Sequence, residues 1–166
     1  MPNNPKIIKD GQIIDNEWLL VTEVSALENG LPEGSLIVSM EIWQQYKDQL
    51  TSRNTGLWLT NDVNLSDITE SLDQFEVIAI DFPVFMDGRG FSLARLLRDR
   101  YGYQGEIRAT GAFIRDQLCY LKRSGFNAFD LADDIDINGA LASLNDFSDG
   151  YQTSADQQTP LFRRRA

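Results

Sequence analysis

The stretch VIAIDFPVFMDGRGFSLARLLRDRYG, residues 77–102, decides the fold class. Residues 77–80 form a continuous apolar run, which is typical of a central parallel strand covered on both faces. Apolar residues at the spacing of one helix face follow from Leu93 to Tyr101, and Gly102 suits a left-handed helix end. The stretch therefore predicts one βα unit: a strand, a long connection and a helix.

The same alternation continues on both sides of this unit. Five βα units imply a mainly parallel sheet with right-handed crossovers. We predict a single α/β domain over residues 1–151, either an open three-layer sheet, which we prefer, or a half-barrel-like arrangement. The other expected strands are 36–38, 57–59, 106–109 and 126–131, and helices are expected over 42–50, 65–75, 114–121 and 140–147.

Both ends of the chain differ from this pattern. Two short β-type runs, 12–14 and 18–21, flank Asp15-Asn16-Glu17 and predict an N-terminal β-hairpin. Residues 152–166 are polar, lack periodicity and end in PLFRRRA, which predicts a mobile basic tail. The tail is either a frayed end or a docking peptide. Its candidate partner-binding residues are Arg163, Arg164 and Arg165.

Composition excludes several kinds of site. The 166 residues include no histidine and one cysteine, Cys119. The chain therefore lacks the residues for histidine catalysis, for the usual zinc centres and for a four-thiolate iron–sulfur cluster. Gly88-Arg89-Gly90 begins a GxGxxG fingerprint, but Leu93 occupies the third glycine position. We expect no metal site, and no cofactor is evident, although a borrowed flavin or haem stays open.

Charge is unevenly distributed along the chain. The net charge is −10, yet residues 81–125 carry 8 basic and 5 acidic side chains. An acidic body disfavours nucleic-acid binding, whereas a local basic centre suggests a small anion or an acidic partner. No stretch approaches the roughly 20 apolar residues that span a bilayer. The polar N-terminus lacks a signal-peptide pattern, so a cytoplasmic protein is expected.

The candidate site follows from the long connection after residues 77–80. Open sheets bind ligands at the carboxyl ends of their strands, where helix N-termini and arginines favour an oxyanion. The alternative is a structural network, with Asp116 pairing with Arg115 and Asp87 clamping a turn with Arg89. The candidate anion-binding residues are Arg89, Arg108 and Arg115, and the candidate catalytic carboxylates are Asp87 and Asp116.

Two further charged groups have competing interpretations. Arg95 and Arg98 are expected on the exposed face of the helix after residues 77–80, where they would bind an acidic partner. Because Asp99 lies four residues after Arg95, a solvated ion-pair face is the alternative. Residues 133–136 contain three aspartates but no EF-hand pattern, and we interpret them as a helix-capping acidic turn.

Longer strings carry a family resemblance. FPVFMDGRGFSLARLLRDRYGYQGEIRATG (82–111), RSGFNAFDL (123–131) and PLFRRR (160–165) resemble the bacterial domain-of-unknown-function family 934 (DUF934). Its members carry the label "oxidoreductase probably involved in sulfite reduction". The resemblance covers the chain from about residue 35 onward. It implies a context of sulfur assimilation, in which members accompany the sulfite reductase haemoprotein.

The resemblance and the composition together favour one function. We expect an accessory protein of assimilatory sulfite reduction that binds or assists the haemoprotein without carrying the redox centre. The alternative is a small-oxyanion-binding enzyme or binding protein that uses the arginine and aspartate residues above. A scaffold without a ligand is the third interpretation, and the oligomeric state stays open.

Overall fold

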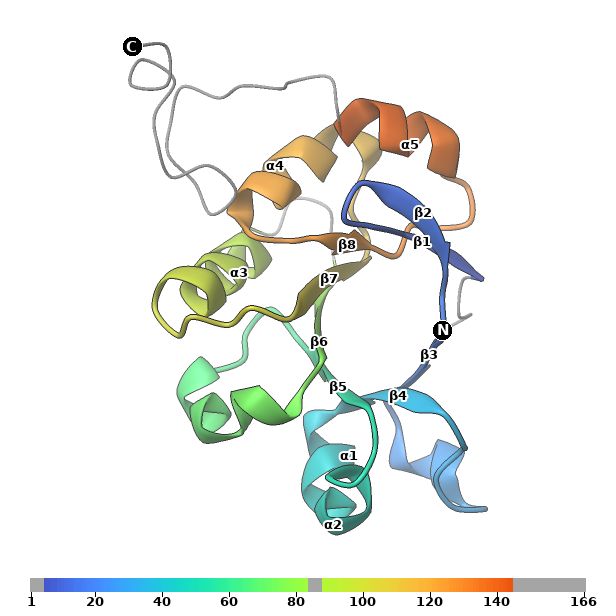
Figure 1. The fold of residues 1–166 in the computed structure, drawn as a ribbon, viewed down its shortest axis with the longest axis vertical. Helices are drawn as coiled ribbons and strands as arrows, with labels where there is room; N and C mark the ends of the chain where they lie inside the picture. Colours follow the sequence, from blue (N-terminus) through green and yellow to red (C-terminus); the bar gives the residue numbers. More distant parts are fainter. Residues whose placement is uncertain (1–4, 84–87, 145–166) are drawn as a thin grey trace.

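The structure is a computed structural model that describes residues 5–83 and 88–144. Its centre is an eight-stranded sheet with the strand order β2-β1-β8-β7-β6-β5-β4-β3 (Figure 1). Strands β3 to β8 run parallel, and β1 is antiparallel to both β2 and β8. The strands are β1 (Lys6–Lys9), β2 (Gln12–Asp15), β3 (Trp18–Val21), β4 (Ser35–Ser39), β5 (Thr55–Leu59), β6 (Val77–Phe82), β7 (Glu106–Gly111) and β8 (Ala128–Phe129).

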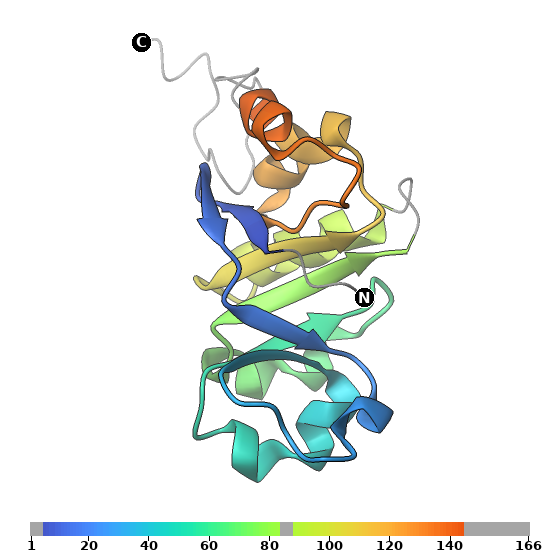
Figure 2. The same cartoon turned by 90° about the vertical axis from the view of Figure 1, so that its right-hand side faces the viewer.

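The sheet curls because its two edge strands are neighbours in the chain. Strands β2 and β3 lie at opposite ends of the strand order, yet only Asn16 and Glu17 separate them. Three Cα–Cα steps of about 3.8 Å bridge at most about 11 Å, so the edges must approach each other. Figure 2 shows the chain passing directly from β2 into β3 across the open side of the curl.

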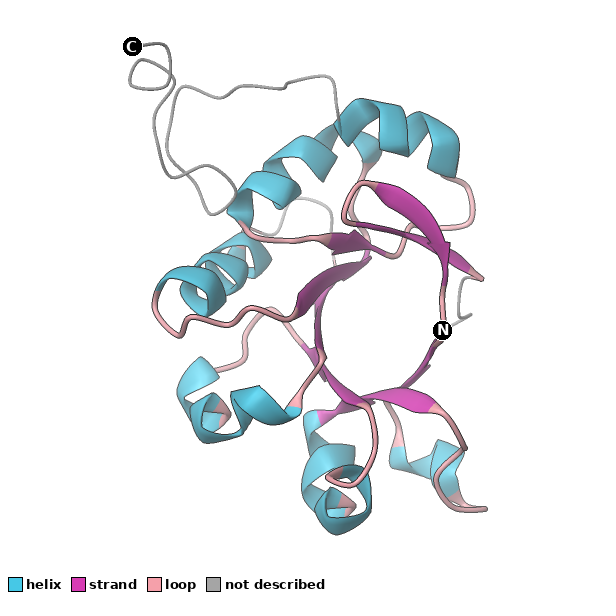
Figure 3. Cartoon of the chain, viewed as in Figure 1, coloured by secondary structure: helices cyan, strands magenta, loops and turns pink. Residues whose placement is uncertain are grey.

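The described helices cover the convex side of this sheet (Figure 3). An open three-layer sheet would need helices on both faces, so the form that we preferred from the sequence is wrong. The half-barrel-like alternative is confirmed. The α-helices are α1 (Met40–Gln45), α2 (Lys47–Leu50), α3 (Arg89–Asp99), α4 (Leu118–Ser124) and α5 (Ile137–Leu144), and the 3-10 helices are η1 (Val24–Leu27), η2 (Leu65–Asp67), η3 (Thr69–Gln74) and η4 (Arg115–Gln117).

An N-terminal hairpin is present, but its strands are not the predicted pair. Strands β1 and β2 form it around Asp10 and Gly11, whose φ angles are 51° and 77°. Two successive positive φ angles are the backbone of a type I′ turn, which suits the twist of a hairpin. The predicted run 18–21 is strand β3, and it pairs in parallel with β4 instead.

Local corrections concern the lengths of elements. The predicted helix 42–50 divides at Tyr46 into α1 and α2, and residues 65–75 form η2 and η3 instead of an α-helix. Strand β8 has two residues, whereas 126–131 was expected. Ile114, the first residue of the predicted helix 114–121, instead precedes η4 and is 43% exposed. The end of the predicted helix 140–147 and the basic tail 152–166 lie outside the described residues.

Two apolar clusters lie on opposite faces of the sheet. The larger cluster fills the space between the sheet and the helices, and it includes the buried Leu36, Ile78 and Leu97. The smaller cluster lies on the concave face, where Ile37, Val77 and Ala79 pack against partly buried side chains. Those partly buried side chains are Trp18, Leu20 and Trp58. In the described part of the chain, no helix has the length and apolar character to cross a membrane.

Candidate functional site

A cavity of ≈ 480 Å³ lies where the parallel strands β6, β7 and β8 end. Asp81 and Phe82 reach it from the end of β6, Thr110 and Gly111 from the end of β7, and Leu20 from β3. The segment 130–133, directly after β8, completes the wall. Carboxyl ends of parallel strands are where barrels and open α/β sheets place their ligands. This cavity is therefore the candidate functional site.

Asp81 is the buried ionisable group of the cavity. Its side chain is on the concave face, and the residue is 9% exposed. Thr110, its register partner on β7, donates a hydrogen bond from Oγ1 to Asp81 Oδ1 over 3.3 Å. No Lys or Arg of the described chain forms an ion pair with it. Burial raises the pKa of Asp81, and the Thr110 hydrogen bond opposes this shift only in part.

Gly111 allows the backbone to pass close to Asp81. Its φ is +91°, and a Cβ atom there would lie 2.6 Å from Asp81 Oδ1 and 2.5 Å from the carbonyl oxygen of Phe82. Any side chain would therefore push the Asp81 carboxyl from its position. The next residue, Ala112, donates its N–H to the same Phe82 carbonyl over 2.6 Å. The Ala109-Thr110-Gly111 sequence thus places the Thr110 hydroxyl within hydrogen-bond distance of Asp81 and lets the Gly111 backbone lie close to the same carboxyl.

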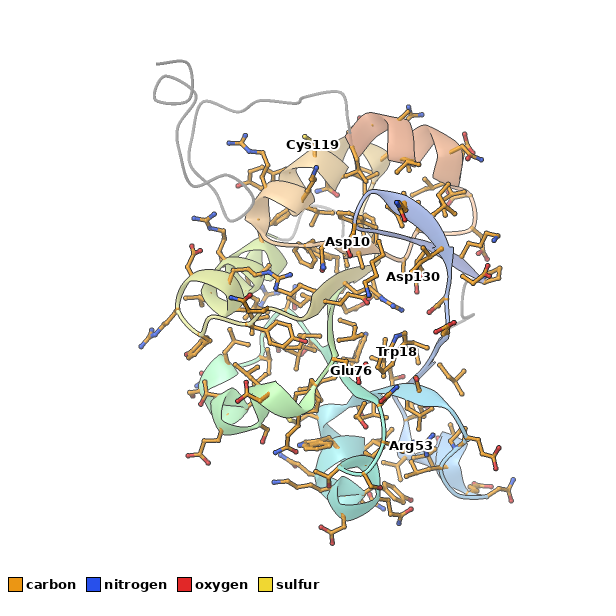
Figure 4. The ribbon with its side chains drawn as sticks, viewed as in Figure 1. Asp10, Trp18, Arg53, Glu76, Cys119 and Asp130 are labelled. Carbon is orange, nitrogen blue, oxygen red and sulfur yellow. The ribbon has the colours of Figure 1, made fainter. Side chains whose placement is uncertain are left out.

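The wall of the cavity is acidic. Its charged side chains are Asp81, half-buried Asp130 and exposed Asp133, and no Lys or Arg of the described residues lines it. Figure 4 shows Asp130 and Trp18 on the concave side of the sheet, Trp18 from β3 and Asp130 from the segment after β8. Such a wall attracts cations and hydrogen-bond donors, and it repels anions.

A different network lies at the other end of the concave face. Glu106 and Arg108 of β7 are both buried, and Arg108 Nε is 2.7 Å from Glu106 Oε1. Lys9 of β1 adds a second cation, with Nζ 3.2 Å from Glu106 Oε2. Arg108 Nη1 also donates to Asn16 Oδ1 over 3.1 Å. Because Asn16 joins β2 to β3, this network closes the seam of the curled sheet.

The three arginines predicted to bind an anion do not converge. Arg108 is buried and bound to Glu106, and it is not at the carboxyl edge, because it lies opposite Ala79 in the middle of strand β7. Arg115 donates from Nε to Ser143 Oγ, and it packs against Gly139 of α5. Arg89 is exposed at the start of α3.

Arg89 interacts electrostatically with Asp62, which lies in the connection after β5. The pKa of Asp62 is lowered first by the Thr60 hydrogen bond, then by a backbone hydrogen bond, and also by the positive charge of Arg89. Asp116 is exposed in η4 and forms no hydrogen bond or ion pair with another described residue, so the pair with Arg115 that was the alternative interpretation is absent from this part of the chain. Asp87 lies outside the described residues.

The two arginines predicted to bind a partner have different environments. Arg95 forms the expected (i, i+4) ion pair with Asp99, at 3.0 Å. Arg98 is half-buried, and it donates to the backbone carbonyls of Tyr103, Gly105 and Gly125 over 2.7, 2.8 and 3.0 Å. Its expected place on the exposed face is wrong, because its guanidinium clamps two loops together. Arg163, Arg164 and Arg165 lie outside the described residues.

The acidic turn before α5 is a helix cap, as predicted. Asp136 accepts hydrogen bonds from the backbone N–H groups of Asn138 and Gly139 over 3.3 and 3.0 Å.

Within residues 5–83 and 88–144, no group of three or more His, Cys, Asp or Glu side chains could hold a metal ion. Cys119 is half-buried in α4.

The family comparison covers β6, β7 and β8, whose carboxyl ends build the cavity. The family model described as "Bacterial protein of unknown function (DUF934)" matches residues 56–162, well over half of the chain. The chain belongs to the DUF934 family. In this DUF934 protein the matched range contains Asp81, Thr110 and Asp130, whereas the hairpin and β4 precede it. No curated protein matches the sequence.

Sequence reasoning did not single out the cavity residues. Asp81, Thr110 and Asp130 are the last residues of three runs, VIAID, IRAT and FNAFD. In this DUF934 protein those three runs are neighbouring parallel strands. A polar residue that ends each of three predicted parallel strands was the signal that could have located the site.

Proposed function

We propose that this DUF934 protein is an accessory protein of assimilatory sulfite reduction that binds the sulfite reductase haemoprotein. Family membership over residues 56–162 is the observation that supports it most directly. The string from 82 to 111 resembles members labelled for sulfite reduction. The role is that of a partner protein, because the redox chemistry belongs to the haemoprotein.

The composition of the chain supports an accessory role. Cysteine thiolates ligate iron–sulfur clusters, and haem iron takes histidine, cysteine, methionine or tyrosine ligands. This chain has one cysteine, half-buried in α4, and no histidine. It therefore cannot supply the four thiolates of a cluster. The electrons of sulfite reduction would pass through the partner.

The outer face of α3 is the surface that best suits such a partner. Leu96 is 40% exposed there, and Arg95 and Arg100 flank it. On the adjacent α4, the Tyr120 side chain is 61% exposed. An exposed apolar side chain between cations fits an acidic partner surface with an apolar centre. Arg98 does not belong to this surface, because it binds backbone carbonyls inside the protein.

Binding of the full chain to the haemoprotein of the same organism, measured by calorimetry at two salt concentrations, tests the proposal. We expect saturable binding that weakens with salt. Reversing both charges in Arg95→Glu/Arg100→Glu should raise Kd by about five- to thirtyfold, since each exposed charge contributes up to about 1 kcal/mol. The matched control is Lys47→Glu, which reverses an exposed lysine on α2.

Three outcomes separate the parts of this proposal. Absence of binding at tens of micromolar would overturn the accessory function. Binding that the α3 double variant does not weaken would place the interface elsewhere. An Arg163→Ala/Arg164→Ala/Arg165→Ala variant then tests the terminal arginines. Arg98 variants are unsuitable probes of the interface, because losing the internal clamp would change stability as well as binding.

A further inference from the structure

We propose that the carboxyl-end cavity binds a small organic cation, with its N–H donors on the Asp81 carboxylate and its apolar body against the cavity wall. The class includes primary ammonium, amidinium and guanidinium groups carried on a short apolar skeleton. This site uses other residues than the partner surface on α3. It can therefore hold or fail independently of the accessory function.

The first argument is the unfinished hydrogen bonding of Asp81. The residue is more than nine-tenths buried, and its carboxylate receives one hydrogen bond, the 3.3 Å contact from Thr110 to Oδ1. No described residue donates to Oδ2, and the carboxyl lines the cavity. Buried carboxylates normally have several donors or a cation, because an unpaired buried charge is strongly unfavourable. The missing donor is best supplied from the cavity.

The second argument is a comparison with Glu106, a buried acid of the same sheet that has cationic partners from the protein itself. Glu106 lies on the neighbouring strand and the same face, and it has Arg108 at 2.7 Å and Lys9 at 3.2 Å. The cavity around Asp81 has no Lys or Arg from the described residues. A bound cation would neutralise Asp81 in the way that Arg108 and Lys9 neutralise Glu106.

The third argument is the character of the wall. Leu20, Phe82, Pro83 and Leu131 surround Asp81 with apolar surface, while Asp130 and Asp133 add negative charge. The volume of ≈ 480 Å³ is within the range of pockets that bury small ligands. A ligand with a cationic head and an apolar body satisfies both kinds of wall, whereas an inorganic anion satisfies neither.

Three ligands of nearly the same shape provide the test: benzamidinium, neutral benzamide and anionic benzoate. Each is titrated into the full-length protein while amide resonances are followed by ¹H–¹⁵N NMR. We expect benzamidinium to shift the amides of Thr110, Gly111 and Leu131 saturably. Benzamide should bind more weakly, and benzoate should leave these amides unchanged. n-Butylammonium is the second cation, for the case that a planar ring does not fit.

Variants then locate the site. Asp81→Asn keeps the shape of the side chain, and it should weaken benzamidinium binding by at least about tenfold, because it removes a charge-assisted hydrogen bond. Asp48→Asn, an exposed acid on α2 that does not line the cavity, is the matched control and should bind as the natural protein does. A dispersed NMR spectrum of Asp81→Asn confirms that the variant is folded.

The proposal is overturned by any of four results. These are benzoate binding at least as tightly as benzamidinium, cation-induced shifts confined to other surfaces, unchanged benzamidinium affinity in folded Asp81→Asn, and no shift by either cation at about 10 mM, which would nearly saturate a site with a Kd of about 1 mM. Haemoprotein binding is measured separately. Failure of the cation to bind leaves the proposed haemoprotein binding unaffected, and failure of haemoprotein binding leaves the proposed cation site unaffected.

Discussion

Glu106 and Asp81 are buried acids at opposite ends of the same concave sheet face, and their surroundings differ. Both residues are nearly inaccessible, at 5% and 9% exposure. Glu106 contacts two cations, one of which also holds the β2–β3 connection through Asn16. Asp81 has one hydroxyl donor and faces a cavity. A buried acid with cation partners is neutralised within the fold, whereas one without them costs stability and is available to a ligand.

The largest expected effect is at the partnered end. Glu106→Gln leaves the buried Arg108 guanidinium without its counter-charge, although the amide oxygen can still accept a hydrogen bond. We expect the free energy of unfolding to fall by about 3 kcal/mol, measured by urea denaturation, because an unpaired buried charge is strongly destabilising. The double variant Glu106→Gln/Arg108→Met should recover most of this loss. A loss below about 1 kcal/mol for Glu106→Gln would mean that the pair is not structural.

The open end should respond with the opposite sign. Asp81→Asn removes a buried carboxyl that has no cation, so we expect the free energy of unfolding to rise by roughly 0.5–2 kcal/mol at neutral pH. The same urea denaturation measures it. Asp116→Asn, at an exposed position, should change stability by less than about 0.5 kcal/mol. A destabilised Asp81→Asn would show that the carboxylate is internally satisfied.

The pH dependence of that gain follows from the raised pKa of Asp81 in the folded protein, which burial causes. Below the unfolded value of about 3.9, the carboxyl is protonated in both states and the variant has little advantage. As pH rises, the unfolded chain releases its proton first, so the natural protein loses stability until the folded carboxyl also ionises. The advantage of Asp81→Asn should therefore grow with pH and then level off. An advantage that shrinks with pH would contradict this interpretation.

The smallest expected effect concerns the hydroxyl that serves Asp81. Thr110→Val removes the donor at nearly constant volume, and we expect a loss of about 0.5–1 kcal/mol. The pKa of Asp81 should rise further, because the hydrogen bond favours the ionised form. A ¹³C NMR titration of the Asp81 carboxyl measures this. Thr60→Val is the control, since Thr60 also donates to an aspartate, Asp62, but in an exposed position.

The strands were predictable because short runs rich in apolar residues alternate with stretches of helical spacing. The run 77–80 and its neighbours on both sides lie in the sheet where the pattern placed them. The predicted hairpin has its turn at residues 15–17, whereas the turn lies at Asp10-Gly11, the two residues with positive φ angles. In residues 65–75 the apolar Leu65, Ile68, Leu72 and Phe75 have helical spacing and are buried, but the segment adopts 3-10 geometry.

The sequence placed the candidate site at the edge of the sheet where the cavity lies, but it singled out Arg89, Arg108, Arg115 and Asp116, none of which lines that cavity. The carboxyl ends of the strands do hold the cavity, as the topology of parallel sheets requires. Arginines drew attention because of their charge, yet Arg98, Arg108 and Arg115 all bind groups of the protein itself. Sequence cannot distinguish an arginine that is bound internally from one that is available, because most of the partners are 5 to 92 positions away.

By itself, the sequence determined the βα alternation, the parallel sheet and the DUF934 family, since these depend on periodicity and on strings of neighbouring residues. It also determined that the chain has no histidine and one cysteine. Only the tertiary structure decided that the sheet curls, because that follows from two edge strands joined by Asn16 and Glu17. The tertiary structure also decided that Lys9 of β1 reaches Glu106 of β7 while Asp81 faces a cavity, because desolvation and the Lys9–Glu106 ion pair depend on contacts between strands distant in sequence.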